Sequence, residues 1–229
     1  MKPLVVVGPP RADRDAVSEL GRLGVATVHE AAGRTGLLGT RLRPLWAGAR
    51  AAGTALTVLC APGDNLMVHV AIEQAGPGDI LVITTTSPSG DGFVGELITT
   101  ALAARQVHGL VTTTGVRDVA AITRSGFPVW SRHVSAQGTV KATAGAVNVP
   151  VSIAGTVVTP GDAVVADDDG VVVVPRLAAG DVARAGRLRE EREDQARAAF
   201  ARGELSLDRY GLRPLLDRLG VRYVPAGES

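Results

Sequence analysis

The backbone amides of Leu97 and Ile98 are the first groups in this sequence with the character of a ligand site. Apolar residues recur at helical spacing from Leu97 to Ala104, so a helix is predicted to begin directly after Gly95. N–H groups in the first turn of a helix lack intrahelical acceptors and can bind an anion. Gly95 has no Cβ, which lets a ligand approach the backbone closely. We therefore expect these three residues to bind a negatively charged group.

Arg117 and Asp118 place opposite charges at the other end of the same stretch. They follow the run HGLVTTTG, whose β-branched residues predict a buried strand. Ligands of open α/β sheets bind beyond the carboxyl ends of the strands. Two interpretations stay open at this point, a ligand site at the strand end and an ordinary exposed ion pair on a loop.

The composition favours one folded domain that acts on small molecules. The chain has 229 residues, and the hydrophobic fraction of 45% suffices for a core. The 24 basic and 23 acidic residues give a net charge of +1, which provides no electrostatic footprint for nucleic acid or an anionic membrane surface. No apolar run is long enough to span a bilayer. We expect a small-molecule partner, no nucleic acid and no membrane.

The single cysteine and the N-terminal residues indicate a cytoplasmic protein. Cys60 lies in the apolar run TALTVLCAP, so an intramolecular disulfide is excluded and a buried thiol is expected. The N-terminal run MKPLVVVGPPRADRD is too short in apolar residues for a signal peptide.

Helices and strands alternate in the first half of the chain. A first helix is predicted after an N-cap at Asp13 or Asp15. A second is predicted from Thr27, with Glu30 completing a capping box. Strands and helices then follow in turn as far as residue 130, which predicts an α/β fold.

In the second half of the chain, a series of short strands is followed by a charged helix. Glycine-punctuated strands up to residue 175 predict an antiparallel sheet or barrel. Asp167, Asp168 and Asp169 suggest a metal site or a hairpin turn, and the turn is favoured because adjacent side chains on an extended chain point in different directions. We expect a catalytic core over residues 1–176 and a helical extension over residues 177–229 of the same domain, which packs on a neighbouring subunit.

Four motifs give the chain a family resemblance. They are GDN at residues 63–65, the stretch of residues 95–118, GDAVVADDDGVVVVP, and the tail RYGLRPLLDRLGVRYV. With them the sequence resembles the family that unites 4-hydroxy-4-methyl-2-oxoglutarate aldolases with the regulator of ribonuclease E activity A. The most specific element is an acidic residue, twenty intervening residues and Arg-Asp, here Glu96, Arg117 and Asp118. Aldolases of the family generally have Asp at the first position, so Glu96 is a conservative departure.

The resemblance implies a fold, an activity and an assembly. The implied fold is an αββα sandwich, assembled as a homotrimer or homohexamer with active sites between subunits. The implied activity is that of a metal-dependent (class II) pyruvate aldolase that cleaves 4-hydroxy-4-methyl-2-oxoglutarate or a related 4-hydroxy-2-oxo acid, with oxaloacetate decarboxylase side activity. The metal would be Mg²⁺, or else Mn²⁺ or another divalent ion. The alternative is a non-enzymatic ribonuclease-binding regulator of the same family.

The chemistry of the matched residues agrees with the enzyme. Asp118 suits a ligand of Mg²⁺, which takes one or two carboxylates and keeps several waters. Arg117 offers a planar fork of donors to the carboxylate and enolate oxygens of pyruvate. Glu96 would act through a metal-bound water as the base. The amides of Leu97 and Ile98 would bind the substrate carboxylate, as the resemblance implies.

Two further expectations concern Glu193 and the lysines. The family places a glutamate of a neighbouring subunit near the metal waters, and Glu193 is the candidate, although a solvated helix face is the favoured explanation of this residue. Lys2 and Lys141 are the only lysines. Neither lies near the matched residues in the sequence, so a Schiff-base mechanism is not favoured.

Overall fold

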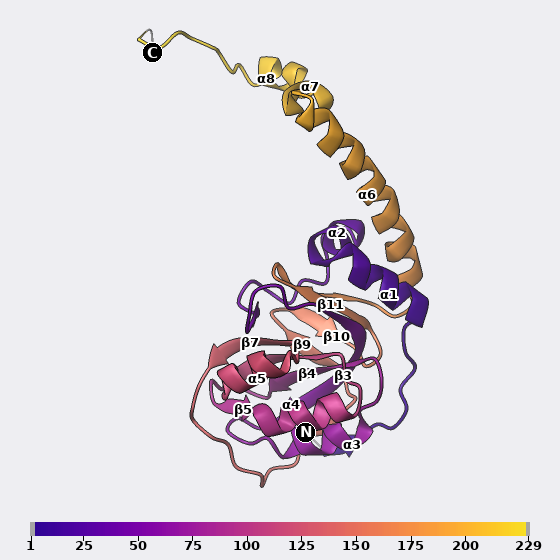
Figure 1. Cartoon of the computed structure of the whole chain (residues 1–229), viewed down its shortest axis with the longest axis vertical. Coiled ribbons are helices and arrows are strands. Elements are labelled where there is room, and N and C mark those ends of the chain that lie inside the picture. The colour runs from indigo at the N-terminus through magenta and orange to yellow at the C-terminus, as the bar shows by residue number, and fades with distance from the viewer. Residues whose placement is uncertain (1–2, 228–229) are drawn as a thin grey trace. The chain divides into compact units, whose positions relative to one another are not determined.

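The computed structural model describes residues 3–227, which form two compact units (Figure 1). The first unit is Met1–Arg187 and the second is Leu188–Ser229, so the division falls inside the long helix α6 (Ala179–Ala201). The expected boundary between residues 176 and 177 stays a prediction. No helix of the described residues is long and apolar enough to cross a membrane.

The first unit is built on a ten-stranded sheet. Its strands are β1 (Leu4–Val5), β2 (Arg43–Pro44), β3 (Ala51–Cys60), β4 (Asp79–Thr85), β5 (Gly92–Val94), β6 (Gly109–Val116), β7 (Val129–Val134), β8 (Ala146–Val147), β11 (Ala163–Asp167) and β12 (Gly170–Val174). A separate antiparallel pair consists of β9 (Val151–Ile153) and β10 (Thr156–Val158). The helices of this unit before α6 are α1 (Arg14–Leu23), α2 (Val25–Ala31), α3 (Leu66–Gln74), α4 (Glu96–Ala104) and α5 (Val119–Ser125).

The centre of the sheet is parallel. Strands β3, β4, β6 and β7 are neighbours in that order, and each adjacent pair is parallel. Helices α3, α4 and α5 lie in the successive connections, so right-handed crossovers bring them all to one face. These strands are covered on both faces, which is why they appear in the sequence as nearly continuous apolar runs.

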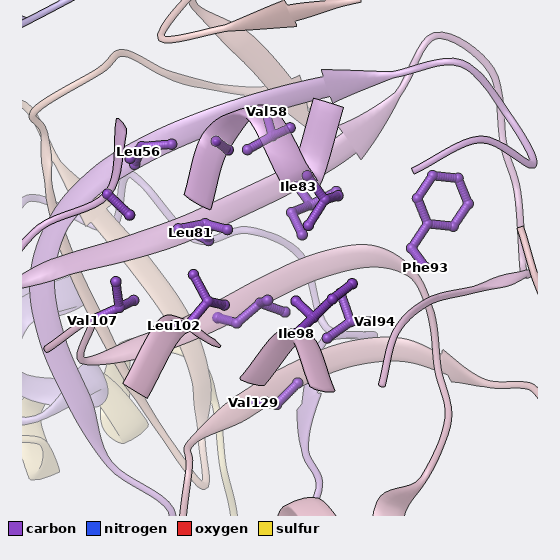
Figure 2. Packing of buried hydrophobic residues seen from close by; sticks show 14 of the residues in the cluster. Leu56, Val58, Leu81, Ile83, Phe93, Val94, Ile98, Leu102, Val107 and Val129 are labelled. Atoms are coloured by element: carbon purple, nitrogen blue, oxygen red, sulfur yellow. The ribbon is translucent and has the colours of Figure 1, made fainter. Parts of the chain in front are cut away.

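Helix α4 is held in the core by its apolar side. Ile98 and Leu102 of this helix belong to the same buried cluster as Leu81 and Ile83 of β4 (Figure 2). Burial of such side chains contributes roughly 1.5–3 kcal/mol each relative to exposure. The position and direction of the α4 N-terminus are therefore fixed by packing.

Two further clusters complete an αββα sandwich, as expected. Alternate residues of β11 face opposite sides: Val164 packs with Ile80 and Trp130 of the central sheet, whereas Val165 packs with Leu20 of α1. The layers are thus α3–α5, the central sheet, the β9–β12 layer, and α1 and α2 together with the first residues of α6. Figure 1 shows α1 and α2 beside β11, away from α3–α5.

The first helix begins at one of the two N-caps that the sequence indicates. Asp13 is its N-cap and accepts a hydrogen bond from the Ala16 N–H at 2.9 Å. It ends at Gly24, whose φ of 82° is readily adopted only by glycine.

The predicted start of the second helix is wrong. Helix α2 begins at Val25, so Thr27 and Glu30 lie inside it and form no capping box. The Val25 N–H donates instead to Asp167 Oδ2 at 2.8 Å, from the turn between β11 and β12. The carboxylate of Asp167, distant in the sequence, therefore caps this helix in place of the hydroxyl of Thr27.

The three consecutive aspartates form the favoured hairpin turn. Asp167 ends β11 and its Oδ1 accepts from the Asp169 N–H at 2.9 Å, while Asp168 accepts from the Gly48 N–H at 2.9 Å. The side chains of Asp167 and Asp168 thus bind separate backbone groups, as the extended-chain argument predicts.

The second unit is helical and leaves leucines exposed. After α6 it contains two short helices, α7 (Ser206–Arg209) and α8 (Arg213–Arg218). Within the structure described, the exposed fractions are 57% for Leu205, 40% for Leu215 and 68% for Leu219.

Candidate functional site

The pairing of β5 with β6 joins the two predicted ends of residues 95–118. The strands are parallel, and Val94 is opposite Val116. The Arg117 N–H continues the pairing by donating to the Val94 carbonyl oxygen at 2.9 Å. Because the chain passes from Val94 directly into α4, the first turn of that helix lies beside Arg117 and Asp118. The helix start and the strand end therefore form one site.

Asp118 connects the two segments through its side chain. Its Oδ2 accepts a hydrogen bond from the Glu96 N–H, the first amide of α4, at 3.2 Å. Asp118 has φ of 58°, a left-handed conformation that aspartate tolerates better than most residues. This backbone turns the side chain toward α4, although Asp118 stands at the N-cap of α5. With 47% of the side chain exposed, the carboxylate remains open to solvent and to a ligand.

Arg117 lies among glycines with its guanidinium group half exposed. Its Nε lies 3.7 Å from Asp118 Oδ2, a loose pair that contributes little to stability at this exposure. A Cβ on Gly92 would lie 3.5 Å from Arg117 Cβ, one on Gly95 would lie 3.1 Å from Nε, and one on Gly138 would lie 3.6 Å from Nη1. The glycines leave the space that the arginine occupies, and they leave its terminal N–H groups available to a substrate.

Gly95 is required for close approach and not for an unusual conformation. Its φ of −133° and ψ of −173° are extended values that any residue adopts. A Cβ at this position, however, would lie only 2.4 Å from Asp118 Oδ2. The absence of a side chain at Gly95 thus permits the contact between the α4 N-terminus and the carboxylate.

The two amides expected to be unpaired differ in the structure, and their role in binding stays a prediction. The Ile98 N–H donates to the Gly95 carbonyl oxygen at 3.1 Å and is not free, because the helix opens with a tight turn. The Leu97 N–H has no acceptor among the residues that the structure describes. Leu97 is also 79% exposed, so its amide remains the available donor at this helix end.

Glu96 points along its own helix. Its Oε1 accepts from Thr100 Oγ1 at 3.2 Å, one turn further along α4. The side chain is half-buried and shares the α4 N-terminus with the Asp118 carboxylate.

Glu193 belongs to the second unit. Its Oε1 pairs with Arg189 Nε at 2.7 Å, four residues earlier on α6. Its approach to the site from a neighbouring subunit stays a prediction.

Asn65 supports the site and was not singled out from the sequence. It is 5% exposed, and its Nδ2 donates to the Phe93 carbonyl oxygen at 2.9 Å, which fixes β5 just before Gly95. Its Oδ1 has no hydrogen-bond partner within residues 3–227. The tripeptide GDN, which contains Asn65, was noted in the sequence as one motif of the family resemblance, without a role for this residue.

Asp64 is a structural carboxylate. Burial acts to raise its pKa, but the N–H groups of Leu66, Ala142 and Thr143 donate to it, and the pKa is lowered on balance. An ionised group with three amide donors is poorly suited to act as a base. It ties the start of α3 to the loop that follows β7.

Cys60 is confirmed as a buried free thiol and is unsuited to nucleophilic catalysis. Burial raises its pKa to about 12, and the nearby Asp64 carboxylate adds to the effect. A thiol of this kind is inert at neutral pH.

Metal-ligating side chains do not gather into a large cluster among the described residues. Within the described part of the chain, no group of three or more His, Cys, Asp or Glu residues could hold a metal ion. A cation beside Asp118 would therefore rely on one or two carboxylates and on water. This donor set suits Mg²⁺ and does not suit a structural zinc ion.

Known proteins with similar sequences and folds point to one family. The family model named RraA-like, described as Aldolase/RraA, matches residues 17–173. A protein of Halalkalibacterium halodurans, named "Putative 4-hydroxy-4-methyl-2-oxoglutarate aldolase", is 30% identical over 188 residues, which cover 82% of this chain and 89% of that protein. A Burkholderia multivorans protein of the same name is 34% identical over 143 residues, covering 62% and 87%.

A solved structure agrees with this match. Streptomyces coelicolor RraAS2, described as an unusual member of the RNase ES inhibitor RraA protein family, has a TM-score of 0.75 at 27% identity. The match covers 83% of this chain and 99% of that one.

Proposed function

This chain belongs to the RraA-like family, and on that premise we propose that it is a divalent-metal-dependent pyruvate aldolase. Its substrate is 4-hydroxy-4-methyl-2-oxoglutarate or a related 4-hydroxy-2-oxo acid, and decarboxylation of oxaloacetate is a side activity. The observation that carries the proposal is the hydrogen bond from the Glu96 N–H to Asp118 Oδ2, which brings two carboxylates and Arg117 to one helix start. The names of the relatives support the same reaction.

The residues at the site fit a divalent cation. Asp118 would hold it, since its carboxylate is half exposed and only Oδ2 bonds to a described backbone group. Glu96, and Glu193 of a neighbouring subunit, would act on its waters. When bound, the cation polarises the 2-oxo group and offsets the negative charge of the developing enolate.

The side chains account for the remaining needs of the reaction. The 4-hydroxyl group loses its proton, the bond between C3 and C4 breaks, C4 becomes a ketone carbon, and the electron pair passes to the pyruvate enolate. Glu96 receives the proton through a water molecule. Arg117 donates to the carboxylate and the enolate oxygen, and the Leu97 N–H, together with the positive end of α4, binds the substrate carboxylate.

A ribonuclease-binding regulator is the second candidate function. The likeness to RraAS2 over 83% of this chain favours it, and one fold can serve both functions. The assembled Glu96, Arg117 and Asp118 favour the enzyme, since a docking role does not require this arrangement.

The decisive experiment measures pyruvate released from 4-hydroxy-4-methyl-2-oxoglutarate and from oxaloacetate. We expect turnover with Mg²⁺, its loss after EDTA treatment, and recovery on adding Mg²⁺ or Mn²⁺. Divalent ions alone decarboxylate oxaloacetate slowly, so protein-free samples with the same metal are subtracted. A folded protein that releases no pyruvate from either substrate, or that keeps full turnover without metal, would refute the proposal.

Replacing Gly95 by alanine should reduce kcat by roughly ten- to a hundredfold, the usual cost of disturbing a group that supports a metal site. The new Cβ requires the space of Asp118 Oδ2, 2.4 Å away, and displaces the carboxylate. Gly76→Ala is the matched control, because a Cβ there meets no atom within 4 Å. Steady-state kinetics with Mg²⁺ titration checks the result, and unchanged kinetics in Gly95→Ala would contradict the assigned contact.

We propose in addition that the working form is a homotrimer or homohexamer. The support is the resemblance together with Leu205, Leu215 and Leu219, which remain exposed on the second unit. Sedimentation velocity at the assay concentration should show a trimer or a multiple of it. A fully active monomer would contradict this assembly.

A further inference from the structure

A cavity of about 570 Å³ opens at the edge of the sheet opposite the proposed active site. Its walls come from the beginnings of β3, β4 and β6, whereas Arg117 follows the end of β6. Helix α1 and the residues before it close the other side. The cavity lies wholly within the first unit and shares no lining residue with the site above.

The titratable side chains that line the cavity are basic. They are Arg11, Arg14, Arg50 and His108, and no Asp or Glu occurs among the described lining residues. Asp79 lies just behind the wall, almost fully buried. It faces Arg11, whose Nη2 lies 2.9 Å from Asp79 Oδ2. One acidic charge therefore offsets one of three arginines.

The Asp79 carboxylate is already satisfied by the protein. Its Oδ1 accepts from Thr54 Oγ1 at 3.0 Å, and its Oδ2 also accepts from the Gly76 N–H at 2.9 Å. Asp79 thus anchors Arg11 and leaves no oxygen directed at the other basic groups. A surplus of positive charge remains at the cavity.

The basic groups are positioned by bonds that use only part of their donor capacity. Arg50 Nη2 donates to the Gly21 carbonyl oxygen at the end of α1, at 3.2 Å. His108 Nδ1 lies 2.8 Å from the Ala52 carbonyl oxygen, so this nitrogen carries the proton. The Arg14 side chain forms no hydrogen bond or ion pair with any described residue. Because a guanidinium group has five N–H donors, several remain for a ligand.

We propose that this cavity binds a phosphorylated small molecule. Guanidinium forks match phosphate oxygens bidentately, and Arg14 and Arg50, which form no ion pair with a described carboxylate, suit a group with two negative charges. The volume lies in the usual range for small-ligand sites. Ala12, Val17 and Pro77 also line the cavity and can contact the organic part of the molecule.

Calorimetric titration of the full chain with inorganic pyrophosphate and with adenosine monophosphate tests the proposal. Arg14→Gln is the informative variant, because the Arg14 side chain bonds to no described residue and its loss should leave the fold intact. Arg41→Gln is the charge-matched control, since Arg41 is exposed and lies outside the cavity. Arg117→Gln separates this cavity from the proposed active site.

We expect one molecule bound per chain, with the affinity roughly tenfold or more weaker in Arg14→Gln, as for loss of a charge-assisted hydrogen bond. Arg41→Gln and Arg117→Gln should bind as the native chain does. The proposal is overturned if the native chain shows no binding up to millimolar probe, if Arg14→Gln leaves the affinity unchanged, or if Arg117→Gln weakens it as much. Failure here would leave the aldolase assay untouched.

Discussion

Replacing Asp118 by alanine should lower pyruvate release on the order of a thousandfold. The carboxylate holds the proposed cation and accepts the first N–H of α4, so its loss removes a charge and an organising contact together. Raising the Mg²⁺ concentration should not restore kcat, because the remaining carboxylate of Glu96 is bound to Thr100 along its own helix. Coupled pyruvate assays over a Mg²⁺ series measure both effects.

Asp118→Asn distinguishes charge from geometry. Alanine is strained at φ of 58°, whereas asparagine tolerates this conformation and can still accept the Glu96 N–H. We expect the Asn variant to keep the native melting temperature and yet lose most of the activity. Near-native turnover in Asp118→Asn would show that the negative charge is not needed and that the metal assignment is wrong.

Arg117→Lys should lower kcat on the order of a hundredfold while keeping the positive charge. A lysine ammonium is a single point of charge and cannot donate to the carboxylate and the enolate oxygen together. KM should change less than kcat, because the enolate oxygen carries its full charge only after the carbon–carbon bond begins to break. Steady-state kinetics with saturating Mg²⁺ measures the two parameters separately.

Arg124→Lys on the neighbouring α5 controls for the chemical change itself. Arg124 is exposed and carries no role in the proposed reaction. It should keep native kinetics. An Arg117→Lys enzyme with turnover as high as the Arg124→Lys enzyme would show that the arginine does not stabilise the enolate.

The sequence predicts those features of the fold that depend on nearby residues. Asp13 caps α1 through the Ala16 N–H, three residues away, and such a contact is visible in the local pattern. The start of α2 depends on Asp167, which lies 142 residues from Val25. No local rule brings that carboxylate to the helix, so the sequence predicts a capping box at Thr27 that does not form.

In the candidate site, too, the features that depend on nearby residues are predictable and those that depend on distant residues are not. The helix after Gly95 and the strand before Arg117 are local features and were predictable. Their contact depends on β5, which has only three residues and follows a glycine-rich loop, so the sequence pattern does not predict it as a strand. Asn65, which fixes β5 through the Phe93 carbonyl oxygen, was missed for the same reason. The basic cavity was also invisible, because Arg11, Arg50 and His108 meet only after the sheet has formed.

In the β5–α4–β6 connection, the number of residues between Glu96 and Arg117 determines how the start of α4 faces the end of β6. The intervening chain comprises the rest of a nine-residue helix, a short return and an eight-residue strand, and it closes on itself through the pairing of Val94 with Val116. Closing so short a loop costs little conformational entropy, so the site can assemble without waiting for distant parts of the chain. Because this connection is short, its exact length is critical. One residue added to α4 would turn its first amide by about 100° relative to the strand end, and the site would be lost with every one of its side chains still present.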